Sequence, residues 1–347
     1  MERSLSIAIR ADANPSLGYG HVRRTLTMVE QLQQMADVEV YYLMRSDSDP
    51  CFIQNAGCEV VSLKDKGIEE IAKVFRPEDG PLILDTYTLT LTELEFLNWS
   101  GYCTTVFDDS RRLLCYPADI VVDYAPGAPN LPYKGLASTR FCLGPDFFPL
   151  RREFPDYRPQ SPNPSTVRHI VITFGGSDPD DQTARLLEIF EGHTHPWKIS
   201  AILGPGYRGK ILNQKDQPGK IELRRDVTDM AQLCATADLA ISGAGGTSLE
   251  LAFLGVPALL LELSEDQRLI ASSLAKANVA VDLGWHASVS NGKIWEKIVT
   301  LARNPSHLRS MRRAGRRLVD GCGAERIAIA IMEAWNRHKQ DRGMNIG

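Results

Sequence analysis

The segment Gly18-Tyr19-Gly20-His21 holds the residue types in this chain that are best suited to chemistry. Glycine lets backbone N–H groups approach a ligand closely, and the N-terminus of a helix attracts anions. A helix N-terminus also disfavours a protonated imidazole, so we expect His21 to be neutral and able to accept a proton. A neutral imidazole beside an anion-binding loop suits a reaction that uses a general base and releases a phosphate.

The residues on either side of this segment predict the elements that position it. Ser6–Arg10 has the pattern of a strand, and apolar residues recur at helical spacing from Val22 to Leu32. In parallel α/β sheets, ligands bind beyond the carboxyl ends of the strands, where this loop would lie. Arg23 and Arg24 differ in direction by about 100° on a helix. We therefore expect one of them to reach a ligand or an aspartate and the other to be solvated.

A second glycine loop, Gly243-Ala244-Gly245-Gly246, follows the strand-like run Leu239–Ser242 and precedes a helical segment that ends near Gly255. A strand, a glycine loop and a helix N-terminus suit a diphosphate. The spacing of Thr247 and Glu250 also fits a capping box, in which each side chain satisfies the other residue's backbone N–H group. Capping and ligand binding both stay open, because a carboxylate in that turn could also reach ribose hydroxyls.

A third loop, Gly175-Gly176-Ser177-Asp178-Pro179, follows the expected strand His169–Phe174. Its end predicts a helix start, with Asp178 as the N-cap and Pro179 at the first helical position. Capping does not need the paired glycines, which leaves room for a ligand. Neither of the first two loops spells G-x-G-x-x-G, and the chain has no G-x-x-x-x-G-K-[ST], so dinucleotide and ATP sites are disfavoured.

Strand-like and helix-like segments alternate through the chain and are interrupted once by a proline-rich polar stretch. This alternation predicts parallel sheets with helices on both faces. We expect an α/β protein with two Rossmann-like domains that face each other across a cleft. The expected divisions are a first domain over 1–154, a linker over 155–166, a second domain over 167–323, and a C-terminal helix and tail over 324–347. The expected strands are Ser6–Arg10, Val38–Met44, Glu59–Leu63, Leu82–Asp85, Thr104–Phe107, Ile120–Val122, His169–Phe174, Lys198–Leu203, Ile221–Leu223, Leu239–Ser242 and Ala258–Leu261.

The composition argues against several classes of protein. Among 347 residues, Lys and Arg number 39 and Asp and Glu number 43, a net charge of −4 that does not suit a dedicated nucleic-acid binder. The odd number of cysteines, without a C-x-x-C pair, indicates neither a disulfide framework nor a zinc knuckle, and a reducing cytoplasm fits best. No apolar run is long enough for a signal peptide or a membrane span. No His, Asp or Glu cluster has metal-ligand spacing, so we expect no metal and no other cofactor.

The three loops and their neighbours resemble the UDP-sugar hydrolases of pseudaminic-acid synthesis, which cleave UDP-2,4-diacetamido-2,4,6-trideoxy-β-L-altropyranose. That family is similar to the N-acetylglucosaminyltransferase of peptidoglycan synthesis and to spore-coat polysaccharide proteins, and it shares the two-domain glycosyltransferase-B (GT-B) architecture. Chance motifs seldom match in order over most of a chain. The matching segments are Arg10-Ala11-Asp12, Gly18–His21 with Arg24, Asp85-Thr86-Tyr87, Phe107-Asp108-Asp109, Leu143–Asp146, Leu150–Phe154, Gly175–Asp178, the run from Ser242 through Glu250 to Gln267, and Val319-Asp320-Gly321.

The resemblance implies hydrolysis of a UDP-linked diacetamido-trideoxy sugar to UDP and free sugar, with His21 activating water against the anomeric carbon. It implies that the second domain holds most of the nucleotide. We expect a cytoplasmic monomer whose partner is the small-molecule UDP-sugar. The expected substrate-binding residues are Gly18, Tyr19, Gly20, Arg24, Tyr87 and Asp109. The expected nucleotide-binding residues are Gly175, Gly176, Ser177, Gly245, Gly246, Thr247, Glu250, Asp266 and Gln267.

Three positions depart from the family's usual residues, and each could touch the substrate. They are Thr86, where the family often has histidine, Asp266, where it often has asparagine, and Asp123-Tyr124, where it often has an Asn-containing turn. The identity of the sugar therefore stays open. Adjacent residues at a strand end point in opposite directions. For this reason we expect one of Asp108 and Asp109 to be a cap or ion-pair partner and the other to lie near the ligand.

Two other functions stay open. A glycosyltransferase of the same fold would pass the sugar to an acceptor instead of water. It would need an acceptor face, for which the arginine-rich segment 309–317 is a candidate, although such a segment is more often a solvated surface. A nucleotide-sugar-binding protein without turnover would not need His21. UDP release from UDP-amino sugars without an acceptor would distinguish these functions.

Overall fold

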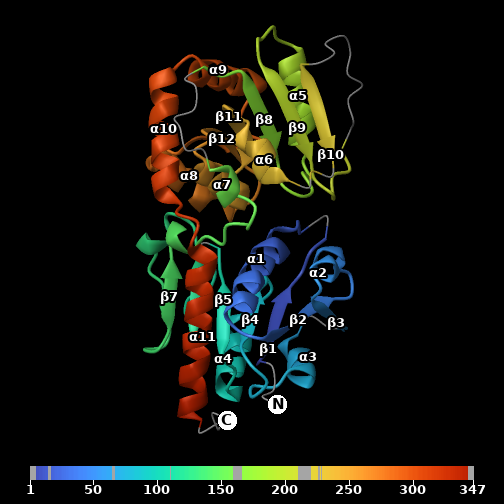
Figure 1. The fold of residues 1–347 in the computed structure, drawn as a ribbon, viewed down its shortest axis with the longest axis vertical. Coiled ribbons are helices and arrows are strands. Elements are labelled where there is room, and N and C mark those ends of the chain that lie inside the picture. Colours follow the sequence, from blue (N-terminus) through green and yellow to red (C-terminus); the bar gives the residue numbers. More distant parts are fainter. Residues whose placement is uncertain are drawn as a thin grey trace. The chain divides into compact units, whose positions relative to one another are not determined.

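The computed structural model describes residues 5–14, 17–64, 67–109, 111–158, 166–209, 220–225, 227 and 229–342. The chain divides into two compact units, one made of Met1–Leu150 with Cys322–Gly347 and the other of Arg151–Gly321 (Figure 1). Residues 159–165, which form most of the linker that we expected, lie outside the described residues. The last helix of the chain therefore belongs to the first unit, an assignment that the sequence does not provide.

The first unit is built on a parallel sheet with the strand order β3-β2-β1-β4-β5-β6-β7. Its central strands are buried on both faces, and β4 (Leu82–Asp85) and β5 (Thr104–Phe107) are buried at every residue. The six strands expected in this half are all present. The additional edge strand β7 (Arg140–Leu143) is short and only partly buried, so it lacks the apolar run that marks the others. The remaining strands are β1 (Leu5–Ala11), β2 (Val38–Arg45), β3 (Glu59–Leu63) and β6 (Ile120–Asp123).

Helix α11 (Gly323–Asp341) packs beside α1 (Gly20–Met35) in the first unit (Figure 1). Its buried residues, which include Ile327, Ile331 and Trp335, join the core cluster that contains Val22 and Leu32 of α1. A side chain at Gly323 would lie 2.2 Å from the carbonyl oxygen of Phe148, so glycine permits this close approach. The other helices of the unit are α2 (Cys51–Asn55), α3 (Ile68–Val74) and α4 (Leu91–Ser100), with short 3-10 turns at Ala128–Asn130 and Pro145–Phe147.

The second unit has its own parallel sheet, with the strand order β10-β9-β8-β11-β12-β13. All five expected strands are present. The edge strand β13 (Ala280–Trp285) was not predicted, because it is mostly half-buried and its pairing with β12 is irregular. The other strands are β8 (His169–Thr173), β9 (Lys198–Leu203), β10 (Ile221–Arg225), β11 (Leu239–Gly243) and β12 (Ala258–Glu262). The helices are α5 (Gln182–Glu191), α6 (Met230–Ala235), α7 (Gly246–Leu254), α8 (Gln267–Lys276), α9 (Asn291–Ala302) and α10 (Pro305–Leu318), with a 3-10 turn at Pro155–Tyr157.

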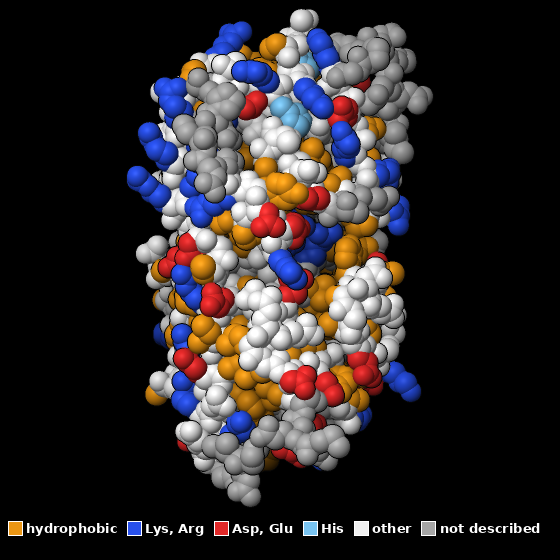
Figure 2. Space-filling model, in the orientation of Figure 1, with side chains coloured by type: hydrophobic (Ala, Val, Ile, Leu, Met, Phe, Trp, Pro, Cys, Tyr) orange, Lys and Arg blue, Asp and Glu red, His pale blue; other side chains and the backbone are white. Residues whose placement is uncertain are grey.

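The arginine-rich helix α10 lies against α7, and a side chain at Gly315 would lie 2.7 Å from the carbonyl oxygen of Ala252. Arg312 is 5% exposed and donates a 2.8 Å hydrogen bond to the carbonyl oxygen of Asp238, so it anchors the helix. Figure 2 shows Lys and Arg side chains gathered on the side of this unit where α10 lies, and the exposed residues there include Arg309, Arg313 and Arg317. The helix is thus partly a structural element and partly a charged surface.

None of the helices in the described part of the chain combines the length and the apolarity that crossing a membrane requires. The seven cysteines are all free, as their odd number and spacing led us to expect.

Candidate functional site

His21 occupies the first turn of α1, directly after the glycine loop at the carboxyl end of β1. Gly18 has a φ of 81°, a conformation that favours glycine, and its N–H group donates to the carbonyl oxygen of Asn14 at 2.8 Å. A side chain at Gly18 or Gly20 would meet no atom of the described residues within 4 Å. The loop therefore presents its backbone to open space, as a ligand-binding loop requires.

The imidazole of His21 is held by a carboxylate that we had not assigned to the site. His21 Nδ1 lies 2.6 Å from Oδ1 of Asp85, the last residue of β4, which is completely buried. Strands β1 and β4 are neighbours, and their register pairs Asp85 with Ala11, close to the glycine loop. Arg24 Nη2 lies 3.1 Å from the same nitrogen, but the contact with the ionised carboxylate is shorter. A neutral ring that donates from Nδ1 to this carboxylate keeps on Nε2 the lone pair that can accept a proton.

Arg24 lies one turn after His21 on the same side of α1 and joins two carboxylates. Its Nε donates to Asp85 Oδ2 at 2.6 Å, and its Nη1 donates to Asp109 Oδ1 at 2.9 Å. Nη1 also donates to the hydroxyl of Tyr124 at 2.8 Å. Arg24 is thus the arginine that reaches aspartates, while Arg23 is half-buried and its guanidinium lies 4.8 Å from the ring centroid of Phe52.

Both aspartates of this cluster are kept ionised. Burial would raise the pKa of the Asp85 carboxyl, but the charge of Arg24 and the hydrogen bonds from Arg24 and His21 outweigh burial and hold that pKa well below its usual range. Burial also opposes ionisation of Asp109, and the charge and hydrogen bonds of Arg24 lower its pKa in the same way. A carboxyl group with a lowered pKa has no proton to give at neutral pH, so neither aspartate is suited to general-acid catalysis.

Tyr87 lies at the exposed edge of this cluster, with 41% of its surface accessible. Its ring packs edge-on against the His21 imidazole, with 4.6 Å between the ring centroids. Its hydroxyl donates to Asp109 Oδ2 at 3.3 Å. Tyr87 and Asp109 therefore lie beside His21, and their contact with a substrate stays a prediction.

Asp108 and Tyr19, in contrast, have structural partners. Asp108 accepts hydrogen bonds from the hydroxyls of Tyr116 at 2.7 Å and Tyr133 at 2.8 Å, and it forms an ion pair with Arg112. The Tyr19 side chain is buried, and its hydroxyl donates to Asp49 rather than reaching the cluster. Only the backbone of Tyr19 remains available to a ligand at this loop.

In the second unit, the capping-box interpretation of the β11–α7 loop is wrong. The helix begins at Gly246 after the N-cap Gly245, no side chain caps it, and Thr247 already lies inside the first turn. Glu250 accepts two hydrogen bonds from Arg151, at 2.6 Å from Nε and 2.9 Å from Nη2. Because the Glu250 carboxylate binds Arg151, it does not accept a hydrogen bond from the start of the helix. The first N–H groups of α7 therefore have no side-chain acceptor at the N-cap.

Gln267 connects this loop to the next one. Its Oε1 accepts hydrogen bonds from the N–H groups of Ala244 and Leu263, both at 3.1 Å. Asp266 occupies the N-cap position of α8, directly before Gln267. The two residues therefore lie beside the glycine loop at the carboxyl edge of the second sheet.

The third loop starts its helix later than we predicted. Helix α5 begins at Gln182 after the N-cap Asp181, so Pro179 lies in a turn and not at the first helical position. Asp178 still supplies the capping oxygens, accepting from the N–H groups of Gln182 at 2.9 Å and Thr183 at 2.8 Å. Asp178 thus caps the helix although three residues lie between it and Gln182, the first helical residue.

The paired glycines of the third loop also have a packing role. Gly175 has a φ of 74°, and the carbonyl oxygen of Gly176 accepts the N–H group of Gly206 at 2.8 Å. A side chain at Gly204 would lie 2.4 Å from both carbonyl oxygens of the pair, so the two loops touch backbone to backbone. Ser177 follows in the same turn.

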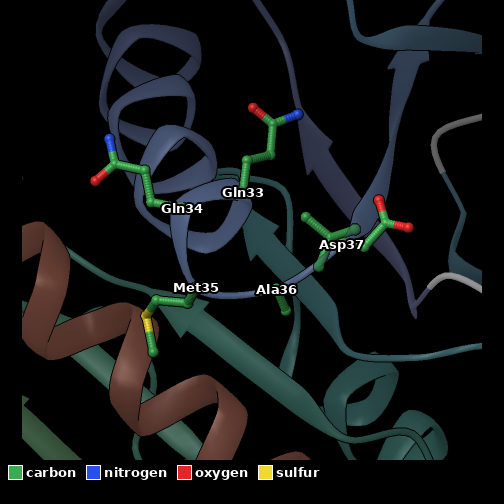
Figure 3. A pocket seen from close by; sticks show the side chains of 6 residues that line it. Gln33, Gln34, Met35, Ala36 and Asp37 are labelled. Atoms are coloured by element: carbon green, nitrogen blue, oxygen red, sulfur yellow. The ribbon is translucent and has the colours of Figure 1, made fainter.

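A hollow on the surface of the first unit lies at the far end of α1 from His21. It is lined by residues 33–38, and Figure 3 shows the labelled side chains of Gln33, Gln34, Met35 and Asp37 spread around the turn between α1 and β2 without converging. At 1.5 Å per residue, His21 and Gln33 are about 18 Å apart along the helix. This hollow is therefore separate from the cluster around His21.

Comparison with solved structures identifies the architecture. The structure of MurG from Acinetobacter baumannii matches with a TM-score of 0.66 and 17% sequence identity, covering 94% of this chain and 99% of that one. The chain has the GT-B fold. Within it, residues 170–321 match the glycosyltransferase family 28 C-terminal domain, and the β11–α7 and β12–α8 loops lie in the matched region.

Several other proteins are similar to this chain in sequence. An uncharacterized protein of Methanocaldococcus jannaschii is 30% identical over 76% of this chain, which spans only 57% of that protein's length. The spore coat polysaccharide biosynthesis protein SpsG of Bacillus subtilis is 23% identical over 96% of this chain and 99% of its own length. A Helicobacter pylori protein named pseudaminic acid cytidylyltransferase and UDP-2,4-diacetamido-2,4,6-trideoxy-β-L-altropyranose hydrolase is 21% identical over 77% of this chain and 46% of its own length.

Proposed function

We propose that this chain hydrolyses a UDP-linked diacetamido-trideoxy sugar to UDP and free sugar, in nonulosonic (pseudaminic-type) acid or surface-polysaccharide synthesis. The observation that carries the proposal is the 2.6 Å contact between His21 Nδ1 and the buried carboxylate of Asp85, which leaves Nε2 as a base. The name of the Helicobacter relative includes this hydrolysis, and the name of the Bacillus relative includes polysaccharide synthesis.

In the proposed reaction, His21 Nε2 takes a proton from water as the water oxygen attacks the anomeric carbon. The bond between that carbon and the diphosphate oxygen breaks, and its electron pair leaves with UDP. The Asp85 carboxylate stabilises the imidazolium that forms, as the carboxylate does beside the base in other His–Asp pairs. UDP is already a good leaving group, so the reaction needs less help from a general acid. The ionised state of Asp85 and Asp109 agrees with this division of roles.

We assign sugar contacts to Arg24, Tyr87 and Asp109 and to the loop backbone at Gly18, Tyr19 and Gly20, because they surround His21. The diphosphate is assigned to the first N–H groups of α7, where Gly245 leaves the helix start without a side-chain cap. The ribose is assigned to Glu250, whose position is fixed by Arg151. The remaining nucleotide contacts are assigned to Gly175, Gly176, Ser177, Gly246, Thr247, Asp266 and Gln267.

A glycosyltransferase is the second candidate, and the match to the glycosyltransferase family 28 C-terminal domain favours it. In that reaction, His21 would deprotonate an acceptor hydroxyl instead of water. The two candidates differ in one requirement, since only the transferase needs a second substrate before the donor is cleaved.

The test is to incubate the purified protein with a panel of UDP-amino sugars without acceptor and to measure UDP by chromatography. Release of many UDP molecules per protein molecule without an acceptor supports the hydrolase. Release only after an acceptor is added supports the transferase. For the hydrolase, reaction in ¹⁸O-water should place the label in the sugar, with inverted anomeric configuration, because one base and no second nucleophile indicate direct attack by water. Label in the phosphate of UDP would contradict attack at carbon.

A further inference from the structure

Cys103, Asp119 and His338 come together in the first unit, far from one another in the sequence. One ligand atom from each, the thiol sulfur, a carboxylate oxygen and an imidazole nitrogen, lie within 4.8 Å of one another. Cys103 directly precedes β5, Asp119 directly precedes β6, and His338 lies in the last turns of α11. The group is therefore at the amino ends of the strands, the opposite edge of the sheet from His21.

Cys103 is buried, Asp119 and His338 are half-buried, and all three side chains are held by their neighbours. Cys103 is almost completely buried, and Asp119 Oδ2 accepts the N–H group of Thr104 at 2.8 Å. The ring of His338 stacks on Trp335 with 5.7 Å between centroids and 18° between planes. His338 Nε2 is buried and has no hydrogen-bond partner among the described residues. Buried polar atoms nearly always have a partner, so an unpartnered nitrogen on the imidazole that joins this thiol and carboxylate is evidence for a ligand.

We propose that Cys103, Asp119 and His338 bind a zinc ion. A thiolate, an imidazole and a carboxylate are the three ligand types that zinc accepts, whereas magnesium and calcium prefer oxygen alone. Water completes the tetrahedron. The Cys103 thiol loses its proton to solvent when the ion binds, so zinc affinity rises with pH. The three ligand atoms must move closer together when the ion binds, because zinc–ligand bonds are only about 2.0–2.3 Å long.

The ion clamps α11 to the sheet of the first unit. His338 comes from the last helix of the chain, while Cys103 and Asp119 belong to the segments that start β5 and β6. A bond across such a long stretch of sequence removes more freedom from the unfolded chain than from the folded one. The site is separate from the proposed reaction, because it lies at the opposite edge of the sheet from His21.

The experiment uses the full chain without an affinity tag, stripped with a chelator and then titrated with Co²⁺ and Zn²⁺. We expect one cobalt ion per chain, a thiolate-to-cobalt charge-transfer absorption, and a higher melting temperature when Zn²⁺ is added. Cys103→Ala and His338→Gln should each weaken zinc binding by more than the roughly 10–100-fold that a change outside the ligand shell costs. Cys142→Ser, which changes another buried cysteine of the same unit, should keep the wild-type absorption.

For each variant, the melting temperature with Zn²⁺ is compared with the melting temperature of the same variant without Zn²⁺. A loss of stability that comes from the substitution itself lowers both values and leaves their difference unchanged. A wild-type protein that shows no charge-transfer absorption and no zinc-dependent shift overturns the proposal. A Cys103→Ala variant that binds cobalt with wild-type absorption overturns it as well, since another thiol would then be the ligand.

Discussion

Asp85 accepts a hydrogen bond from Arg24 Nε at 2.6 Å and lies at the same distance from His21 Nδ1, so one buried carboxylate positions both the base and the cation beside it. Its lowered pKa keeps it ionised throughout the range in which an imidazole titrates. The tautomer of His21 and the direction of the Arg24 guanidinium therefore depend on the same group.

Asp85→Asn should reduce hydrolysis by about 10²–10⁴-fold, because an amide in this place can donate to His21 Nδ1 and favour the wrong tautomer. Asp12→Asn is the matched control, since Asp12 is also a buried aspartate paired with an arginine, Arg10, and has no assigned contact with the substrate. Single-turnover UDP release measures both. Equal losses in the two variants would contradict a specific role for the Asp85–His21 contact.

His21→Ala should keep the fold and the affinity for UDP while hydrolysis falls by about 10²–10⁴-fold, the usual contribution of a general base. UDP binding by calorimetry and turnover by chromatography separate the two effects. Added imidazole should restore part of the rate, because it can occupy the space that the side chain leaves. Near-wild-type turnover in the variant would remove His21 from the proposed role.

Arg151 and Glu250 should be energetically coupled. Their two hydrogen bonds are short, and their side chains are 16% and 8% exposed. A double-mutant cycle with Arg151→Met and Glu250→Gln should give a coupling free energy of about 0.5–3 kcal/mol in urea denaturation. Additive single changes would show that the pair contributes nothing to stability. UDP affinity measured on Glu250→Gln separately tests the proposed ribose contact.

Turnover should be unchanged in EDTA. Arg24 already neutralises much of the charge of Asp85 and Asp109, and helix N-termini can hold a diphosphate through backbone N–H groups. The same chelator should lower the melting temperature if zinc clamps α11. Activity that disappears in EDTA and returns with magnesium would show that the reaction needs a divalent cation.

His195 should make the second unit less stable in acid. It is 4% exposed, its ring stacks on Trp197, and neither ring nitrogen has a partner among the described residues. Burial lowers the pKa of His195 below its ordinary value of 6.5. The unfolded chain therefore binds a proton before the folded chain does. The free energy of unfolding should fall, by up to about 1.4 kcal/mol per pH unit, as the pH drops from 6.5 toward the folded pKa.

His195→Phe should flatten this part of the pH dependence, as measured by urea denaturation above and below pH 6.5. His169 and His338 also have pKa values lowered by burial, and they are present in both proteins, so the difference in slope reports on His195 alone. An unchanged slope would mean that His195 is solvated or paired when the protein is folded.

The local sequence pattern was sufficient to predict the central strands, because buried parallel strands are apolar runs. It was also sufficient to predict the position of His21, because the glycine loop marks the start of the helix. It was insufficient for the edge strands β7 and β13, which are only partly buried. Asp85 was part of a recognised motif, yet its contact with His21 depends on β4 pairing with β1, a relation that no local spacing contains.

Glu250 shows the converse error. Its spacing from Thr247 fits a capping box, but the carboxylate binds Arg151, which lies far away in sequence. The cluster of Cys103, Asp119 and His338 was missed for a similar reason, since its three segments meet only after α11 has docked. Local spacing indicates which interactions a segment can form, but partners from distant parts of the sequence determine which of them it forms.

Because α11 belongs to the first unit, the order in which the two units are completed during translation is the reverse of the order in which they begin. The second unit is continuous from Arg151 to Gly321 and can fold once it has left the ribosome. The nascent first unit lacks the helix that packs against Val22 and Leu32 until α11 has been translated. Until then, the apolar residues of α1 that α11 covers stay exposed on the growing chain.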